Sequence, residues 1–126
     1  MKIEGEGQLL RVFVGESDRW HGRPLYEAIV LKAREMGLAG ATVLRGLMGF
    51  GADSRLHTAK VLRLSEDLPI VVEIVDKPER IEELLPLLDE MVTEGMVTVE
   101  RVHIVAYRHS GGSEQGTSRP SQASDP

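Results

Sequence analysis

The chain has 126 residues, 41% of them hydrophobic and 28% charged, with a formal net charge of −5. This length suits one domain with a real core, and the acidic balance disfavours a general nucleic-acid binder. Without cysteine, the chain has no disulfides, thiolate metal sites or thiol catalysis. The acidic N-terminus does not resemble a signal peptide, and no stretch approaches the ~20 apolar residues of a membrane span. We therefore expect a cytoplasmic protein.

The first half of the chain predicts a strand, a helix and a second strand. Residues 8–15 are β-rich and close on a glycine, which is typical of a strand. Pro24 suits the first turn of a helix, because its missing N–H costs nothing there, and apolar residues then recur at helical spacing to Met36. Gly37 suits the left-handed position that ends a helix. The next strand is expected over residues 41–47.

The second half predicts two more strands, a helix and a last strand. Residues 61–64 form a short strand after a polar connection, and residues 69–76 form a strand of nearly unbroken apolar residues. A second helix is expected from Pro78 to Gly95, with Pro86 inside it as a point where it should kink or loosen. A final strand region covers residues 96–108.

Apart from the short strand at residues 61–64, these elements follow a βαββαβ order, which predicts an α+β fold of the ferredoxin-like kind. Two helices would lie on one face of a four-stranded, mainly antiparallel sheet. We assign this domain to residues 1–109. Residues 110–126 are mostly Ser, Gly, Gln, Pro and Asp, and they cannot bury enough apolar surface to offset the entropy of ordering, so a disordered tail is expected.

The sheet is expected to have a second apolar face. Two helices can cover only one face, and the other should then alternate to polar residues. Instead, residues 9–14 and 70–75 carry apolar side chains at both odd and even positions. An uncovered apolar face of that size is unusual on a monomer, so we expect copies of the chain to cover it. The alternative is that residues 49–67 or the tail fold over it.

Residues 37–76 carry the most distinctive motifs. They read G-L-A-G-A-T-V at 37–43, G-F-G at 49–51 and L-P-I-V-V-E-I at 68–74. This order of features resembles the PII signalling proteins. The runs G-L-A-G-A-T-V-L-R-G-L-M-G-F-G, S-R-L-H-T-A and L-S-E-D-L-P make the chain most similar to a bacterial and archaeal family of PII-like proteins, domain-of-unknown-function family one-ninety. The resemblance covers about residues 8–107.

The resemblance implies a non-enzymatic signalling protein. PII proteins are homotrimers whose apolar sheet faces line the centre. They bind ATP or ADP in the cleft between subunits, and a long loop reports the bound state to a partner protein. Here that loop would be residues 51–60, the ligand an adenine nucleotide (ATP, ADP or AMP), and the partner a protein such as a membrane transporter. No nucleic acid is expected as a partner.

The glycine segment also favours a ligand cleft on physical grounds. Gly49 and Gly51 let the backbone approach a ligand and present N–H groups to phosphate, which nearby basic side chains could neutralise. The alternative is that these glycines mark turns and bulges beside a solvated loop. The predicted ligand-binding residues are Thr42, Arg45, Gly49, Phe50, Gly51, Ser54, Arg55, His57, Lys60 and Arg101.

The chain departs from the PII pattern where phosphates are held. PII proteins use a glycine- and lysine-rich loop, and residues 93–98 here contain one glycine, no lysine and one glutamate. Ile104 and Ala106 stand at the positions of two PII arginines, although Arg101 and Arg108 lie nearby in the sequence. The sequence therefore leaves three possibilities for the site open, namely a less charged ligand, another nucleotide or no nucleotide.

Two other classes of function are weaker alternatives. CutA-like trimers share this fold and are linked to metal tolerance, but the lack of cysteine and the scattered histidines predict no metal site. Asp53, Ser54 and His57 lie close together in the sequence and could suggest a hydrolase. Loops of this composition are usually only polar, and a triad is recognised by geometry, so we expect no enzyme and no catalytic residue.

Overall fold

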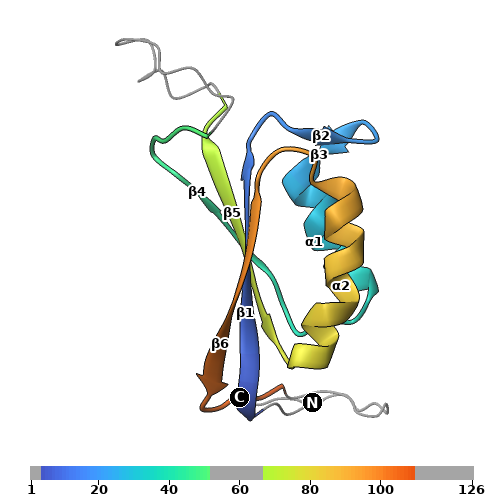
Figure 1. Cartoon of the computed structure of the whole chain (residues 1–126), viewed down its shortest axis with the longest axis vertical. Coiled ribbons are helices and arrows are strands. Elements are labelled where there is room, and N and C mark those ends of the chain that lie inside the picture. The colour runs from blue at the N-terminus through green and yellow to red at the C-terminus, as the bar shows by residue number, and fades with distance from the viewer. Residues whose placement is uncertain (1–3, 52–66, 110–126) are drawn as a thin grey trace.

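A four-stranded antiparallel sheet with two helices on one face forms the fold (Figure 1). The computed structural model describes residues 4–51 and 67–109. Each neighbouring pair of strands is antiparallel, which confirms the predicted ferredoxin-like α+β fold. The sheet order is β4-β5-β1-β6, formed by β1 (Gly5–Gly15), β4 (Thr42–Arg45), β5 (Pro69–Asp76) and β6 (Met96–Ile104).

The two helices begin and end at residues that favour those positions. Helix α1 (Leu25–Glu35) starts directly after Pro24, and Gly37 follows it with a φ of +81°, the left-handed conformation expected there. Helix α2 (Pro78–Met91) continues through Pro86. Pro86 is exposed, so water can reach the carbonyl that loses its helical partner there. In the described part of the chain, no helix has the length and apolarity needed to cross a membrane.

The core lies between the helices and one face of the sheet. Alternate residues of β1 and β5 point toward the helices and are almost fully buried, as the two-residue period of a strand requires. Each helix adds the apolar side of its surface. The buried cluster consists of Leu10, Val12, Val14, Leu25, Ala28, Ile29, Ala33, Ile70, Val72, Ile74, Ile81, Leu84, Leu88 and Met91.

Several element boundaries differ from the expectation. A two-stranded hairpin, β2 (Arg19–Trp20) and β3 (Arg23–Pro24), precedes α1 and was not expected. Strand β4 ends at Arg45, where the Gly46 N–H donates to the Pro69 carbonyl and the chain leaves the sheet. Strand β6 ends at Ile104, because its partner β1 begins opposite it at Gly5. The strand expected over residues 61–64 and the 110–126 tail lie outside the described residues.

The sheet face that points away from the helices, called the open face below, is largely apolar. Figure 1 shows no helix on that side of the sheet. Strand register aligns its side chains in rows that cross the sheet. The apolar row consists of Leu44, Val71, Phe13 and Met96. The polar row next to it consists of Thr42, Glu73, Arg11 and Thr98. Leu44, Phe13 and Met96 are exposed, so the predicted second apolar face is present in the chain.

Candidate functional site

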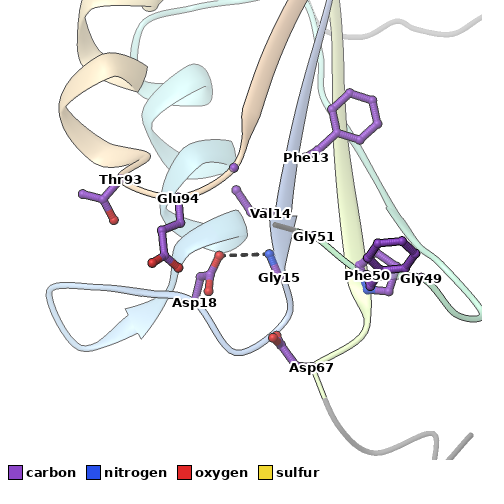
Figure 2. Close-up of a pocket in the computed structure, with 12 residues that line it drawn as sticks. Phe13, Val14, Gly15, Asp18, Gly49, Phe50, Gly51, Asp67, Thr93 and Glu94 are labelled. Carbon is purple, nitrogen blue, oxygen red and sulfur yellow. Dashed lines mark hydrogen bonds between the residues drawn. The ribbon is translucent and has the colours of Figure 1, made fainter. Parts of the chain in front are cut away.

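A pocket of about 470 Å³ lies at the end of the sheet where β1 finishes and β5 and β6 begin (Figure 2). Antiparallel pairing places these strand ends at one end of the sheet, so residues distant in sequence meet there. Residues 49–51, called the glycine loop below, line the pocket at the same end of the sheet. The pocket is lined by Phe13, Val14, Gly15, Asp18, Gly49, Phe50, Gly51, Asp67, Pro69, Thr93, Glu94 and Gly95.

Carboxylates dominate the charge of the described lining. Asp18, Asp67 and Glu94 line the pocket, and the described lining contains no lysine, arginine or histidine. Figure 2 shows Asp18 and Glu94 on one side and Gly49 and Phe50 on the other. This field disfavours a bare polyphosphate, because like charges repel strongly in a partly enclosed site.

Two of these carboxylates also fix the turn that follows β1. Asp18 Oδ2 accepts a hydrogen bond from the Gly15 N–H at 2.9 Å. Asp67 Oδ1 accepts from the N–H of Ser17 at 2.9 Å and from its hydroxyl at 2.7 Å. The wall made by this turn is therefore shaped before any ligand binds, because its backbone N–H groups already have partners.

The structure places three of the predicted ligand residues in the pocket. Gly49, Phe50 and Gly51 all line it, and Phe50 is 71% exposed. Gly49 also lets the loop pass close to Pro69, since a Cβ at residue 49 would lie 3.0 Å from Pro69 Cγ. The glycines thus have a local packing role as well as a position in the pocket wall.

The other described candidates lie outside the pocket lining. Arg45 ends β4, and its Nη2 pairs with Glu16 Oε2 at 3.2 Å. Thr42 lies three positions earlier on β4, about 10 Å away at the usual strand rise. Arg101 lies opposite Gln8 on β1, about 20 Å from the pocket end of the sheet at the same rise per residue. Its Nη1 lies 3.6 Å from Glu6 Oε2. Within one chain, Thr42 and Arg101 do not join the pocket. Ser54, Arg55, His57 and Lys60 lie outside the described residues.

Sequence reasoning missed the acidic side of the pocket. Asp18 and Asp67 were not candidates, and neither was Phe13; the pairing of β1 with β5 brings them to one end of the sheet. The segment at Thr93–Gly95 was noted only as a departure from the PII pattern, and it lines the pocket beside the glycine loop. The sequence feature that could have identified this segment as part of the site was its position directly after the second helix.

Gly95 supplies a conformation in the pocket wall that other residues rarely adopt. Its φ is +145°, and a Cβ there would lie 2.5 Å from the Phe13 carbonyl oxygen. We expect Gly95→Ala to lower the free energy of unfolding by about 2 kcal/mol, measured by urea denaturation. Gly40→Ala is the matched control, because a Cβ at residue 40 would meet nothing within 4 Å. Equal stability of the two variants would contradict this account.

The G-L-A-G-A-T segment lies at the other end of the sheet and is held by its backbone. The Ala39 N–H donates to Asp76 Oδ2 at 2.8 Å, and the Tyr107 hydroxyl donates to the Ala39 carbonyl at 3.2 Å. Arg80 Nη2 donates to the Met36 carbonyl. These contacts give the motif a structural role in positioning the start of β4.

Fold and topology place the chain in the class of α+β proteins with a ferredoxin-like fold. It is similar to a PII-like signalling protein of Thermus thermophilus, with a TM-score of 0.59 and 19% identity over 80% of this chain and 91% of that one. It is also similar to CPII of Thiomonas intermedia K12, a structure with ADP and bicarbonate bound, with a TM-score of 0.56 and 17% identity over 82% and 91%. At these identities the likeness establishes the fold.

Sequence comparison then gives the family. The family model DUF190, described as "Uncharacterized ACR", matches residues 7–104, so the chain belongs to the DUF190 family. A UPF0166 protein of Aquifex aeolicus (strain VF5) is 36% identical over 98 residues, which are 78% of this chain and 92% of the relative. CutA of Synechococcus elongatus PCC7942 is a more distant structural neighbour, with a TM-score of 0.50 and 10% identity over 85% of each chain.

Proposed function

We propose that the chain is a non-enzymatic regulatory protein that self-associates through its open face, as a homotrimer, and binds a small ligand in the pocket. The observation that carries the proposal is the position of Phe13, which belongs both to the apolar row of the open face and to the pocket lining. A copy of the chain that covers the open face would therefore also border the pocket. Ligand binding and association are then coupled through shared residues.

The ligand proposed is an adenine nucleotide with few phosphates. CPII, which shares the fold, has been seen with ADP and bicarbonate and also with ADP, AMP and acetate. The described lining of this pocket offers an exposed aromatic ring at Phe50 and backbone without side chains at Gly49 and Gly51, beside three carboxylates. Stacking on the ring suits a base, whereas the carboxylates oppose a long phosphate chain. Thr42 and Arg101 would contribute only if a neighbouring copy brought them to the cleft.

Ligand binding in the pocket would be communicated to the partner protein by the 51–60 loop. Gly51 lines the pocket at the point where this loop begins, so a ligand that contacts Gly51 acts directly on the start of the loop. The basic residues Arg55 and Lys60 and the imidazole of His57 would then neutralise phosphate or contact the regulated partner, such as a membrane transporter.

A thermal-shift series tests the ligand. A compound that binds only the folded state raises the melting temperature, and above its dissociation constant the rise grows with the logarithm of its concentration. We expect AMP and ADP to raise it by several degrees at millimolar concentration, and ATP without Mg²⁺ to raise it less, because of the acidic lining. If no adenine nucleotide changes the melting temperature, the nucleotide proposal is wrong.

A pair of variants locates the binding. Phe50→Ala should reduce the AMP-induced shift at least by half, because it removes the ring that lines the pocket. Leu47→Ala is the control, because Leu47 is an exposed apolar residue of the same segment that is not part of the lining. An equal shift in both variants and the unchanged protein would place the ligand elsewhere.

A CutA-like role in metal tolerance is the second candidate, supported by the shared fold. Among residues 4–51 and 67–109, no group of three or more His, Cys, Asp or Glu is arranged to hold a metal ion. Divalent metals added to the same thermal-shift series separate the two proposals. A shift with metal alone would favour the CutA-like role. The hydrolase alternative depends on Asp53, Ser54 and His57, which lie outside the described residues.

A further inference from the structure

A charged network lies in the middle of the largely apolar open face. Arg11, on the inner strand β1, donates from Nε to Glu73 Oε2 on β5 at 2.9 Å. It also donates from Nη1 to Glu100 Oε1 on β6 at 3.1 Å. Phe13 and Val71 lie on one side of this network, and Leu9 and Val75 lie on the other.

The network has bonding capacity that the single chain does not use. A guanidinium has five N–H donors, and each carboxylate can accept several hydrogen bonds. Within the described residues, Arg11 uses Nε and Nη1, whereas Nη2 makes no hydrogen bond. The side chains of Arg11, Glu73 and Glu100 are 35%, 31% and 61% exposed, so water completes their bonding in the single chain.

Covering the open face would remove that water. Charges taken out of water are costly unless their remaining hydrogen bonds are made, and each copy carries one cation against two carboxylates in this network. The hydrogen bond to Glu73, followed by the nearby carboxylate charges, raises the pKa of Arg11, so the guanidinium stays charged. The covering surface must therefore supply an acceptor to Nη2 of Arg11 and a donor to the carboxylates.

A second copy of the chain meets both requirements, because its open face carries the same donor and the same acceptors. Glu100 is the better acceptor for a neighbouring copy, since it is the more exposed of the two carboxylates and lies on the edge strand β6. A partner with only one sign of charge would leave part of the network unpaired.

We propose that the network of Arg11, Glu73 and Glu100 sets the register of self-association, with Arg11 of one copy hydrogen-bonded to Glu100 of the next. This inference rests on the proposed self-association through the open face. The apolar rows supply the driving force, and the network permits one relative placement of the copies, because other placements bury unpaired charge.

Cross-linking between labelled copies tests the contact directly. Arg11→Lys keeps the charge and provides an amine that a carbodiimide can join to a carboxylate. Equal amounts of ¹⁴N- and ¹⁵N-labelled Arg11→Lys protein are mixed, allowed to exchange subunits, and cross-linked. We expect a peptide pair that joins residue 11 of one label to Glu100 of the other. Arg19→Lys is the control, because Arg19 lies on the β2 hairpin, which Figure 1 shows on the side of the helices, and residue 19 should enter no mixed-label pair.

Charge exchange tests the energetic role. Arg11→Glu should raise the dissociation constant of the assembly at least 100-fold, and adding Glu100→Arg in the same chain should restore it to within 10-fold. Arg19→Glu should leave it unchanged. Arg11→Met, which keeps the side-chain bulk without the charge, provides a second measurement if Arg11→Glu does not fold, with an expected rise of at least 10-fold.

The outcomes separate this inference from the proposed function. A monomer of the unchanged protein by light scattering overturns the proposed self-association and this inference with it. An oligomer that shows only same-label cross-links, and whose dissociation constant is insensitive to Arg11→Glu or Arg11→Met, overturns this inference alone. Mixed-label cross-links together with rescue by the charge exchange support it.

Discussion

Val71→Lys is expected to convert the self-associated protein into a monomer. Val71 lies in the apolar row between Leu44 and Phe13, so its side chain would be enclosed when a copy covers the open face. A lysine there would place an ammonium in the apolar contact between copies, and an ammonium is costly to desolvate. The dissociation constant should rise by about 1,000-fold, which corresponds to about 4 kcal/mol. Sedimentation equilibrium or light scattering over a dilution series measures it.

The same substitution should leave the fold of the single chain intact. Val71 is only partly buried in the monomer, and a lysine can extend its ammonium into water while its methylenes lie on the sheet. Leu31→Lys is the matched control, because Leu31 is an exposed apolar residue on α1, on the helical side of the molecule. If Val71→Lys associates as tightly as Leu31→Lys, the open face is not the surface through which copies associate.

Asp76→Ala is expected to lower the free energy of unfolding by about 3 kcal/mol. Asp76 is 3% exposed at the end of β5 and accepts hydrogen bonds from two backbone N–H groups, those of Ala39 at 2.8 Å and Lys77 at 2.7 Å. Hydrogen bonds to a charged acceptor are stronger than neutral ones, and removing the acceptor leaves two part-buried N–H groups without this partner. Urea denaturation with a linear extrapolation measures the loss.

Two further variants separate the causes of that loss. Asp76→Asn keeps one acceptor oxygen and should lose only about half as much free energy of unfolding as Asp76→Ala. Asp89→Ala removes a carboxylate from an exposed position of α2 and should change stability by no more than about 0.5 kcal/mol. If Asp89→Ala lowers the free energy of unfolding as much as Asp76→Ala does, the cause is the removal of a negative charge and not the lost hydrogen bonds. Because Asp76 fixes the segment before β4, we also expect Asp76→Ala to weaken proteolytic protection at residues 37–42.

The family and the fold could be predicted from local signals. The start of α2 at Pro78 and the start of α1 directly after Pro24 depend on the fixed backbone of proline, and the helix end at Gly37 depends on a left-handed conformation that glycine tolerates. The alternation of buried residues along β1 and β5 follows from the two-residue period of a strand. Such signals act over a few neighbouring residues, so they can be read along the chain.

The candidate site was only partly predictable. The 49–51 segment was chosen from its own composition and does line the pocket. Asp18 and Glu94 were missed because nothing local distinguishes them from other surface acids, and they become pocket residues only when two strand ends meet. Arg101 was chosen for its closeness in the sequence to PII-like positions, but strand register places it opposite Gln8, far from the glycine loop in the same chain.

The sequence by itself determined the two helices, the four strands of the main sheet, the family, and the presence of an apolar sheet face beyond the one that two helices can cover. The tertiary structure alone decided that the glycine loop faces three carboxylates, and that Arg11 lies between Glu73 and Glu100. The physical reason is sequence separation. Residues 11, 73 and 100 become neighbours only through the register of three strands, and register is set by the packing of the whole sheet on its helices.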